Sequence, residues 1–211
     1  MRRRSARIVL LTGFEPFEGE TVNPSWLAVR RLHGRTIAGH RIVARRLPTT
    51  FTDSLEALRR HLRRFRPRLV ICVGQAGGRA EIMPERVAIN LQDARVPDNA
   101  GRMPRELPVV PGGPAAYWSS LPVRSIVRAL KRRGIPAGVS LSAGTFVCNH
   151  VFYGLLHELA RQGGGVRGGF IHVPFLPAQA ARHRDQPSLP LAMAVDALAV
   201  AVRVSLPGRA H

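Results

Sequence analysis

Residues 52–74 read TDSLEALRRHLRRFRPRLVICVG, and this stretch contains the pattern from which the fold class follows. In its first part, apolar residues recur every three or four positions, as on one face of an amphipathic helix, and Thr52 is a suitable N-cap. The second part, Leu69–Val73, is a continuous apolar run that ends at Gly74, as expected for an interior strand of a parallel sheet. A helix followed directly by a buried strand is the repeating unit of an α/β fold.

The same alternation extends over the rest of the chain. A further helix is expected to begin at Pro24, because proline fits a first helical position and Asn23 can cap it. The other expected elements are strands at Arg7–Leu11, His40–Leu47, Ala137–Leu141 and Phe170–Val173, and helices at Thr52–Phe65, Pro122–Arg133, Val151–Arg161 and Ala192–Val204. The Pro- and Gly-rich segment Ala94–Trp118 is expected to be a long ordered loop. The sequence therefore predicts one α/β domain over residues 1–211 with a mostly parallel sheet.

Composition limits the classes of function. Of the 211 residues, 45% are hydrophobic and 21% are charged, which excludes a disordered chain. No apolar run reaches the ~18 residues of a membrane span, and IVLLTG near the start is too short for a signal peptide, so a cytoplasmic protein without membrane contact is expected. Lys and Arg number 32 against 13 Asp and Glu, a net charge of +19. The basic residues are spread along the chain without a nucleic-acid-binding motif, so nucleic acid is not expected as a partner.

The two cysteines are expected to have different roles. Cys72 lies within the LVICV run and is expected to be an inert core residue. Cys148, in SAGTFVCNHVFYGLLHEL, lies where a loop turns into a helix, and the free N–H groups there favour a thiolate and can stabilise an oxyanion. The alternative for Cys148 is a buried thiol without function. Neither a disulfide framework nor a metal-binding spacing is present, so no metal or other cofactor is expected.

His172 and Glu85 are the partners that could make Cys148 reactive. His172 interrupts an otherwise apolar strand and needs a polar partner, either as a structural residue or as the base of a nucleophile–base pair. Glu85, in MPERVAIN, can orient the imidazole and stabilise its charged form, or else pair with Arg86 or another arginine. Glu81 is a less suitable substitute because it lies farther from the apolar strand. The GQAGGR loop, Gly74–Arg79, lacks the features of known phosphate-binding loops.

Four blocks together resemble the pyroglutamyl peptidase I family. They are LLTGFEPFEGETVNPSW (10–26), VGQAGGRAEIMPERVAINLQDARVPDNAG (73–101), GGPAAYWSSLPV (112–123) with SAGTFVCNHVFYGLLH (142–157), and GFIHVPFLP (169–177). The resemblance runs from about Ile8 to about Ala201. It implies a cytosolic cysteine peptidase that removes an N-terminal pyroglutamyl residue. It also implies a three-layer α/β/α sandwich with a mixed sheet, similar to purine nucleoside phosphorylases, and a homotetramer.

The resemblance assigns the catalytic roles to positions of this chain. The family's nucleophile falls on Cys148, its base on His172 and its acidic member on Glu85. The implied reaction is acyl transfer through a thioester, with His172 protonating the departing amine and then activating water. No metal or organic cofactor is implied.

The resemblance also implies how the lactam ring is recognised. Phe14 and Phe17 are expected to sandwich the ring, while Asn23 and the backbone near Gln75 hydrogen-bond its amide. Arg95 is expected to lie beside the nucleophile and to shape the oxyanion site.

Departures from the family pattern are few. Met83 and Glu18 replace a hydroxyl residue and a glycine of that pattern, and neither belongs to the expected triad. The closing helix lacks cysteine, so no disulfide between subunits is expected. Two other functions remain open: a nucleoside phosphorylase-like activity, suggested only by shared architecture, and an arginine-rich nucleic-acid binder on an inactive peptidase scaffold.

Overall fold

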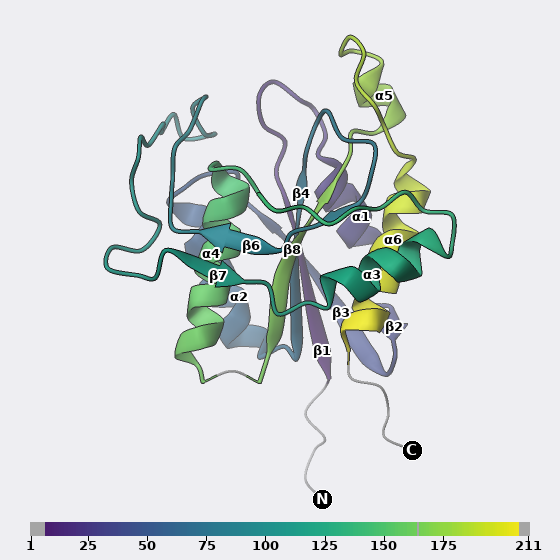
Figure 1. The fold of residues 1–211 in the computed structure, drawn as a ribbon, viewed down its shortest axis with the longest axis horizontal. Helices are drawn as coiled ribbons and strands as arrows, with labels where there is room; N and C mark the ends of the chain where they lie inside the picture. Colours follow the sequence, from purple (N-terminus) through teal and green to yellow (C-terminus); the bar gives the residue numbers. More distant parts are fainter. Residues whose placement is uncertain (1–6, 164, 207–211) are drawn as a thin grey trace, which may run out of the picture.

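The computed structural model describes residues 7–163 and 165–206, and a six-stranded sheet forms its centre (Figure 1). The strand order is β2-β3-β1-β4-β8-β5. The strands are β1 (Ile8–Phe14), β2 (Thr36–Ile37), β3 (His40–Leu47), β4 (Leu69–Gln75), β5 (Met83–Pro84) and β8 (Arg167–Val173). The four inner strands run parallel, while the edge strands β2 and β5 are antiparallel to their neighbours. A separate antiparallel pair consists of β6 (Val87–Ile89) and β7 (Ala116–Trp118).

Helices cover both faces of the sheet. On one face lie α1 (Pro24–Leu32), α3 (Val123–Lys131) and α6 (Leu191–Ser205), and on the other lie α2 (Asp53–Phe65) and α4 (Val147–Arg161) (Figure 1). Alternate residues of the strands face opposite layers: Val9 packs with the first group of helices and Leu10 with the second. The short helix α5 (Pro177–Ala180) follows β8. The expected α/β fold with three layers is therefore confirmed.

Most expected elements are present, with differences at their ends. The strand at His40–Leu47 has the expected bounds, and α2 begins one residue later than expected. The expected cap at Thr52 is wrong, because the backbone of Thr52 is already helical and its side chain makes no cap bond. The hydroxyl of Thr50 instead accepts the N–H of Asp53 at 3.1 Å. By contrast, Asn23 caps α1 as expected, since its side chain accepts the N–H of Ser25.

Two expectations need correction: the strand at Ala137–Leu141 and the start of the helix at Val151. The segment Ala137–Leu141 is not a strand, and it joins the sheet only through isolated bridges to Ile82 and Glu85. Glu85 lies between two short strands, β5 of the main sheet and β6 of the small one. Helix α4 begins at Val147, earlier than expected, which places Cys148 in its first turn. The expected loop Ala94–Trp118 is irregular except for β7 at its end.

The carboxyl ends of β1, β4 and β8 meet at one edge of the sheet because these strands are parallel. Ligands of open α/β sheets bind at this edge. Within residues 7–163 and 165–206, no helix is long and apolar enough to cross a membrane.

Candidate active site

A carboxylate–imidazole pair lies at the carboxyl end of β8. Nδ1 of His172 lies 2.7 Å from Oε1 of Glu85, and antiparallel pairing of Met83 with His172 brings the two side chains together. Glu85 is fully buried and His172 is 4% exposed, so water does not compete for this hydrogen bond. Because an ionised carboxylate only accepts, Nδ1 carries the hydrogen and Nε2 is left as the basic nitrogen.

Cys148 approaches the same place from helix α4. A β-carbon built on Gly74 would lie 2.8 Å from Sγ of Cys148, so the thiol lies directly over the glycine. Gly74 is also the residue that pairs with His172 in the register of β4 and β8. Neighbouring strands are about 4.8 Å apart, and paired residues face the same side of a sheet. The thiol and the imidazole are therefore neighbours, and the absence of a side chain at Gly74 makes room for the sulfur.

The surroundings of the thiol oppose its ionisation. Burial raises the pKa of Cys148 to about 12, with smaller contributions from the negative charge of Glu85 and from Cys72. Part of the Cys148 residue is accessible to solvent. The expectation that the helix start lowers this pKa is therefore wrong, because a helix dipole contributes only about 0.3–1 kcal/mol and burial outweighs it.

Cys72 behaves as expected for a core residue. It lies in β4 and is completely buried, and burial raises the pKa of its thiol to about 12.

A third side chain reaches Glu85, and it is an arginine, the alternative partner expected from the sequence, although its position, Arg79, was not. Nη1 of Arg79 lies 3.5 Å from Oε1 of Glu85 and donates a 3.1 Å hydrogen bond to Oγ of Ser140. Oε2 of Glu85 has no hydrogen-bond partner within the part of the chain that the structure describes. The only signal in the sequence was the position of Arg79 at the end of GQAGGR, shortly before Glu85, and arginines are too common in this chain for that to stand out.

The two aromatic residues expected to bind the lactam ring lie in different surroundings. Phe14, at the end of β1, is 2% exposed, and its ring centre lies 6.3 Å from that of Phe170. Phe17 is partly exposed in the following loop, and its ring centre lies 6.1 Å from that of Phe146, the residue before α4. The ring of Phe170 in turn lies 4.9 Å from the imidazole of His172. Each expected ring-binding residue is therefore joined to the site through one further aromatic side chain.

Most of the hydrogen-bonding capacity of Asn23 is already used. Its Oδ1 accepts from the N–H of Ser25 at 3.0 Å and from the hydroxyl of Ser25 at 2.7 Å. Its Nδ2 donates to the carbonyl of Glu15 at 2.9 Å. An amide oxygen accepts two hydrogen bonds and an amide nitrogen donates two. Asn23 can therefore offer a ligand one N–H donor but no acceptor.

The loop that carries Phe17 and Asn23 is fastened to the end of β4. Gln179 is buried, and its Nε2 donates to Oε1 of Gln75 at 3.2 Å, to Oε2 of Glu20 at 3.0 Å and to the carbonyl of Val22 at 3.3 Å. The side-chain oxygen of Gln75 is thus engaged within the protein.

Arg95 lies in the loop after β6 and is exposed. Two residues earlier, Asp93 exchanges two hydrogen bonds with Thr145: its carbonyl accepts the Thr145 hydroxyl at 2.6 Å, and its N–H donates to the Thr145 carbonyl at 3.1 Å. Thr145 precedes Cys148 by three positions. These bonds bring the loop of Arg95 next to the segment that leads into the nucleophile.

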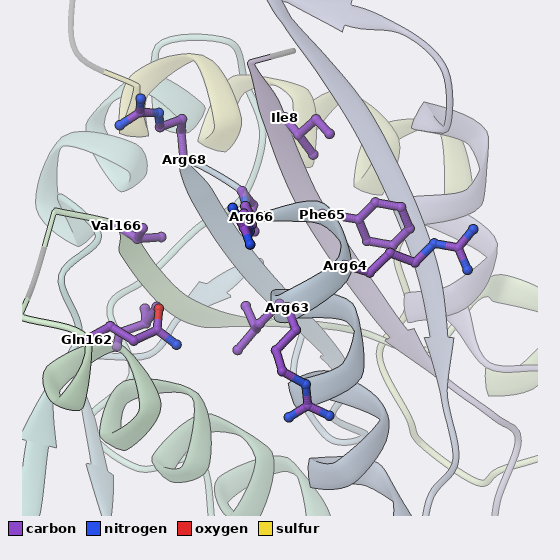
Figure 2. A pocket seen from close by; sticks show the side chains of 11 residues that line it. Ile8, Arg63, Arg64, Phe65, Arg66, Arg68, Gln162 and Val166 are labelled. Atoms are coloured by element: carbon purple, nitrogen blue, oxygen red, sulfur yellow. The ribbon is translucent and has the colours of Figure 1, made fainter. Parts of the chain in front are cut away.

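A cavity of about 700 Å³ lies at the opposite end of the sheet (Figure 2). Its lining includes Ile8 at the start of β1, Val166 before β8, and four arginines: Arg63, Arg64, Arg66 and Arg68. Figure 2 shows the side chains of Arg63, Arg64 and Arg68 pointing away from one another. The cavity lies at the amino ends of the strands, so it is separate from the edge that holds His172. Among residues 7–163 and 165–206, no group of three or more acidic, His or Cys residues could hold a metal ion.

Comparison with known proteins decides the family. Residues 7–207 match the family model described as pyroglutamyl peptidase. The chain belongs to the pyroglutamyl peptidase family. The pyrrolidone-carboxylate peptidase of Klebsiella pneumoniae is 60% identical over 198 residues, which cover 94% of this chain and 92% of that protein.

Solved structures of the pyroglutamyl peptidase family have the same fold. The crystal structure of Bacillus amyloliquefaciens pyroglutamyl peptidase I matches with a TM-score of 0.92 at 52% identity, covering 94% of this chain and 96% of that chain. A mutant pyrrolidone carboxyl peptidase from the hyperthermophile Pyrococcus furiosus matches with a TM-score of 0.90 at 42% identity, covering 94% and 97%. The family, fold and enzyme class expected from the sequence are confirmed: the class is a cysteine-type hydrolase that acts on N-terminal pyroglutamate.

Proposed function

We propose that this member of the pyroglutamyl peptidase family releases N-terminal pyroglutamate from peptides through a thioester on Cys148. The arrangement of Glu85, His172 and Cys148 supports this proposal. Nδ1 of His172 bonds to Glu85 at 2.7 Å, and Sγ of Cys148 lies over Gly74, the strand partner of His172. A nucleophile beside a base, with the base oriented by a third group, is what covalent catalysis of acyl transfer requires.

The proposed reaction begins with a proton transfer from the thiol, whose ionisation is disfavoured by burial. Nε2 of His172 takes the proton as Sγ bonds to the pyroglutamyl carbonyl carbon, and Glu85 stabilises the imidazolium that forms. Backbone N–H groups in the first turn of α4 stabilise the oxyanion. The C–N bond then breaks, and His172 gives its proton to the departing amine. Water, activated by His172, hydrolyses the thioester and restores the thiol.

Recognition of the lactam ring would provide the specificity. Phe14 and Phe17 would bury the ring methylenes, each worth about 0.8 kcal/mol when removed from water. The free N–H of Asn23 would donate to the lactam carbonyl, and the backbone near Gln75 would accept the lactam N–H. Arg95 would help to shape the oxyanion site beside the nucleophile.

A pair of substrates tests this function directly. Release of a fluorogenic amine should be about 10²-fold faster from its pyroglutamyl derivative than from its prolyl derivative, which lacks the ring carbonyl and carries a charged amine. Equal cleavage of the two derivatives would refute the proposed recognition. Cys148→Ser should lose at least ~10³-fold in rate, while Cys72→Ser serves as the matched control and should stay active. Full activity of the Cys148 variant would refute the thioester.

We further propose that residues 1–211 act as one domain, in a homotetramer, in the cytoplasm. Two free cysteines support a reducing compartment, because Cys148 must remain a thiol to react. The tetramer follows from the family resemblance. Sedimentation equilibrium should give four times the chain mass, and a monomer at micromolar concentration would contradict it.

A further inference from the structure

Glu85 carries a charge that His172 balances only during part of the reaction. The imidazole is neutral when it acts as the base and positive only after it has taken the thiol proton. Among the described residues, the other cation in contact with the Glu85 carboxylate is Arg79, whose Nη1 lies 3.5 Å from the same Oε1 that bonds to His172. A buried carboxylate without an opposite charge is strongly disfavoured. Arg79 therefore supplies the balancing charge while His172 is neutral.

Arg79 is held in this place by the turn before it and by the segment around Ser140. Gly78, just before it, has φ +76°, a conformation that favours glycine and turns the loop after β4 back toward the sheet edge. The Arg79 guanidinium donates to the Ser140 hydroxyl at 3.1 Å. Ser140 is itself bridged to Glu85, and its carbonyl accepts the N–H of Arg86 at 2.8 Å. The guanidinium is thus held by the same segment that flanks the carboxylate.

We propose that Arg79 is a positioning residue for the reaction, which balances the charge of Glu85 and fixes the orientation of its carboxylate toward His172. This inference rests on the proposed roles of Glu85 and His172. Arg79 acts through Glu85, because its side-chain hydrogen bonds and ion pair are with Glu85, Ser140 and Ser142 and not with the nucleophile. The arginine of the GQAGGR motif thus faces a carboxylate of its own chain instead of an external anion.

Kinetics of three variants test this role. Arg79→Gln should lower kcat about ten-fold, the scale of coupling within one hydrogen-bonded network, with KM for the pyroglutamyl amide within two-fold of the parent. Arg79→Lys keeps the charge and should recover most of the lost kcat. In a Glu85→Gln background, Arg79→Gln should cause no further loss, because its target charge is gone.

Arg59 offers a matched control. Its Nε pairs with Oε1 of Glu158 at 2.7 Å between α2 and α4, away from the site, so Arg59→Gln should lower the melting temperature and leave kcat unchanged. The proposal for Arg79 is overturned by unchanged kcat in Arg79→Gln, by a rise in KM alone, by equal losses in the Gln and Lys variants, or by additive losses with Glu85→Gln. Full activity of Glu85→Gln alone would instead remove the proposed role of Glu85.

Discussion

Substitution of Gly74 by alanine tests whether the position of the thiol controls the rate. The new methyl group would lie 2.8 Å from Sγ of Cys148 and 2.8 Å from Cζ of Phe170. The backbone at Gly74 does not have a positive φ, so alanine fits the strand conformation and the perturbation is purely steric. Both obstructing side chains lie in the layer between the sheet and α4, where Phe170 is buried and Cys148 is partly buried.

The size of the effect follows from these distances. Non-bonded heavy atoms are at their optimum about 3.5–4.0 Å apart, so the sulfur or the methyl group must move by roughly 0.7–1.2 Å. A misplacement of about 1 Å can cost about 10²-fold in rate, and overpacking a core costs about 1–3 kcal/mol of stability. We expect Gly74→Ala to fold with a lower melting temperature and to lose about 10²-fold in kcat.

The assay is the release of a fluorogenic amine from a pyroglutamyl amide, normalised to folded protein by circular dichroism. Gly168→Ala is the matched control, because its β-carbon would lie 2.5 Å from Leu159, which is also on α4 but far from Cys148. That variant should be destabilised to a similar degree with kcat unchanged. The reasoning fails if folded Gly74→Ala turns over at the parent rate, or if both variants lose kcat equally.

Further predictions concern the thiol, the ring site and the surface charge. With a pKa of about 12, only about 10⁻⁵ of Cys148 is thiolate at pH 7, so alkylation by iodoacetamide should accelerate about tenfold per pH unit up to pH ~11; a plateau near pH 8 would contradict this. Because the Glu85 charge raises the pKa of the thiol, Glu85→Gln should be alkylated faster at a given pH although its turnover falls. Asn23→Ala should lower pyroglutamyl activity more than prolyl activity without changing the rate at which Cys148 is alkylated. If Asn23 serves only to cap α1, the variant should instead be less stable, with an unchanged ratio of pyroglutamyl to prolyl activity. Chelators should leave the rate unchanged. Turnover should also survive replacement by Gln of the four helix-face arginines Arg59, Arg60, Arg63 and Arg64, and a large loss of kcat in a folded variant would assign that face a function.

The elements that sequence reasoning located best are those whose pattern is local. The apolar stripe of α2 and the run of β4 depend on spacing within a few residues, and both are present close to the expected bounds. Cys148 at a helix start and His172 in a strand were placed for the same reason. Glu85 was proposed as the partner of His172 from its residue type, with an arginine as the alternative. Because residues 87 positions apart share no local signal, only the family resemblance assigned it the role.

The remaining differences depend on tertiary context. The segment IMPERVAIN has apolar residues on both sides of Glu85 and Arg86, yet the two sides join different sheets. Strand β5 pairs with β8, and β6 pairs with β7. The pKa of Cys148 depends on the density of atoms around the sulfur, which a sequence does not display. The contact of Arg79 with Glu85 likewise depends on a turn at Gly78 that the glycine permits but does not require.

The way in which Glu85 is held has a consequence for heat inactivation. His172 lies in a strand inside the sheet, and Cys148 lies on a helix of 15 residues. Glu85 instead follows β5, an edge strand of two residues, and is joined outward by a single bridge. Segments with few backbone hydrogen bonds open at a smaller free-energy cost than the whole protein. On warming, β5 and Glu85 should therefore unfold locally while the rest of the sheet stays folded. The enzyme should then lose activity below its melting temperature and regain it on cooling.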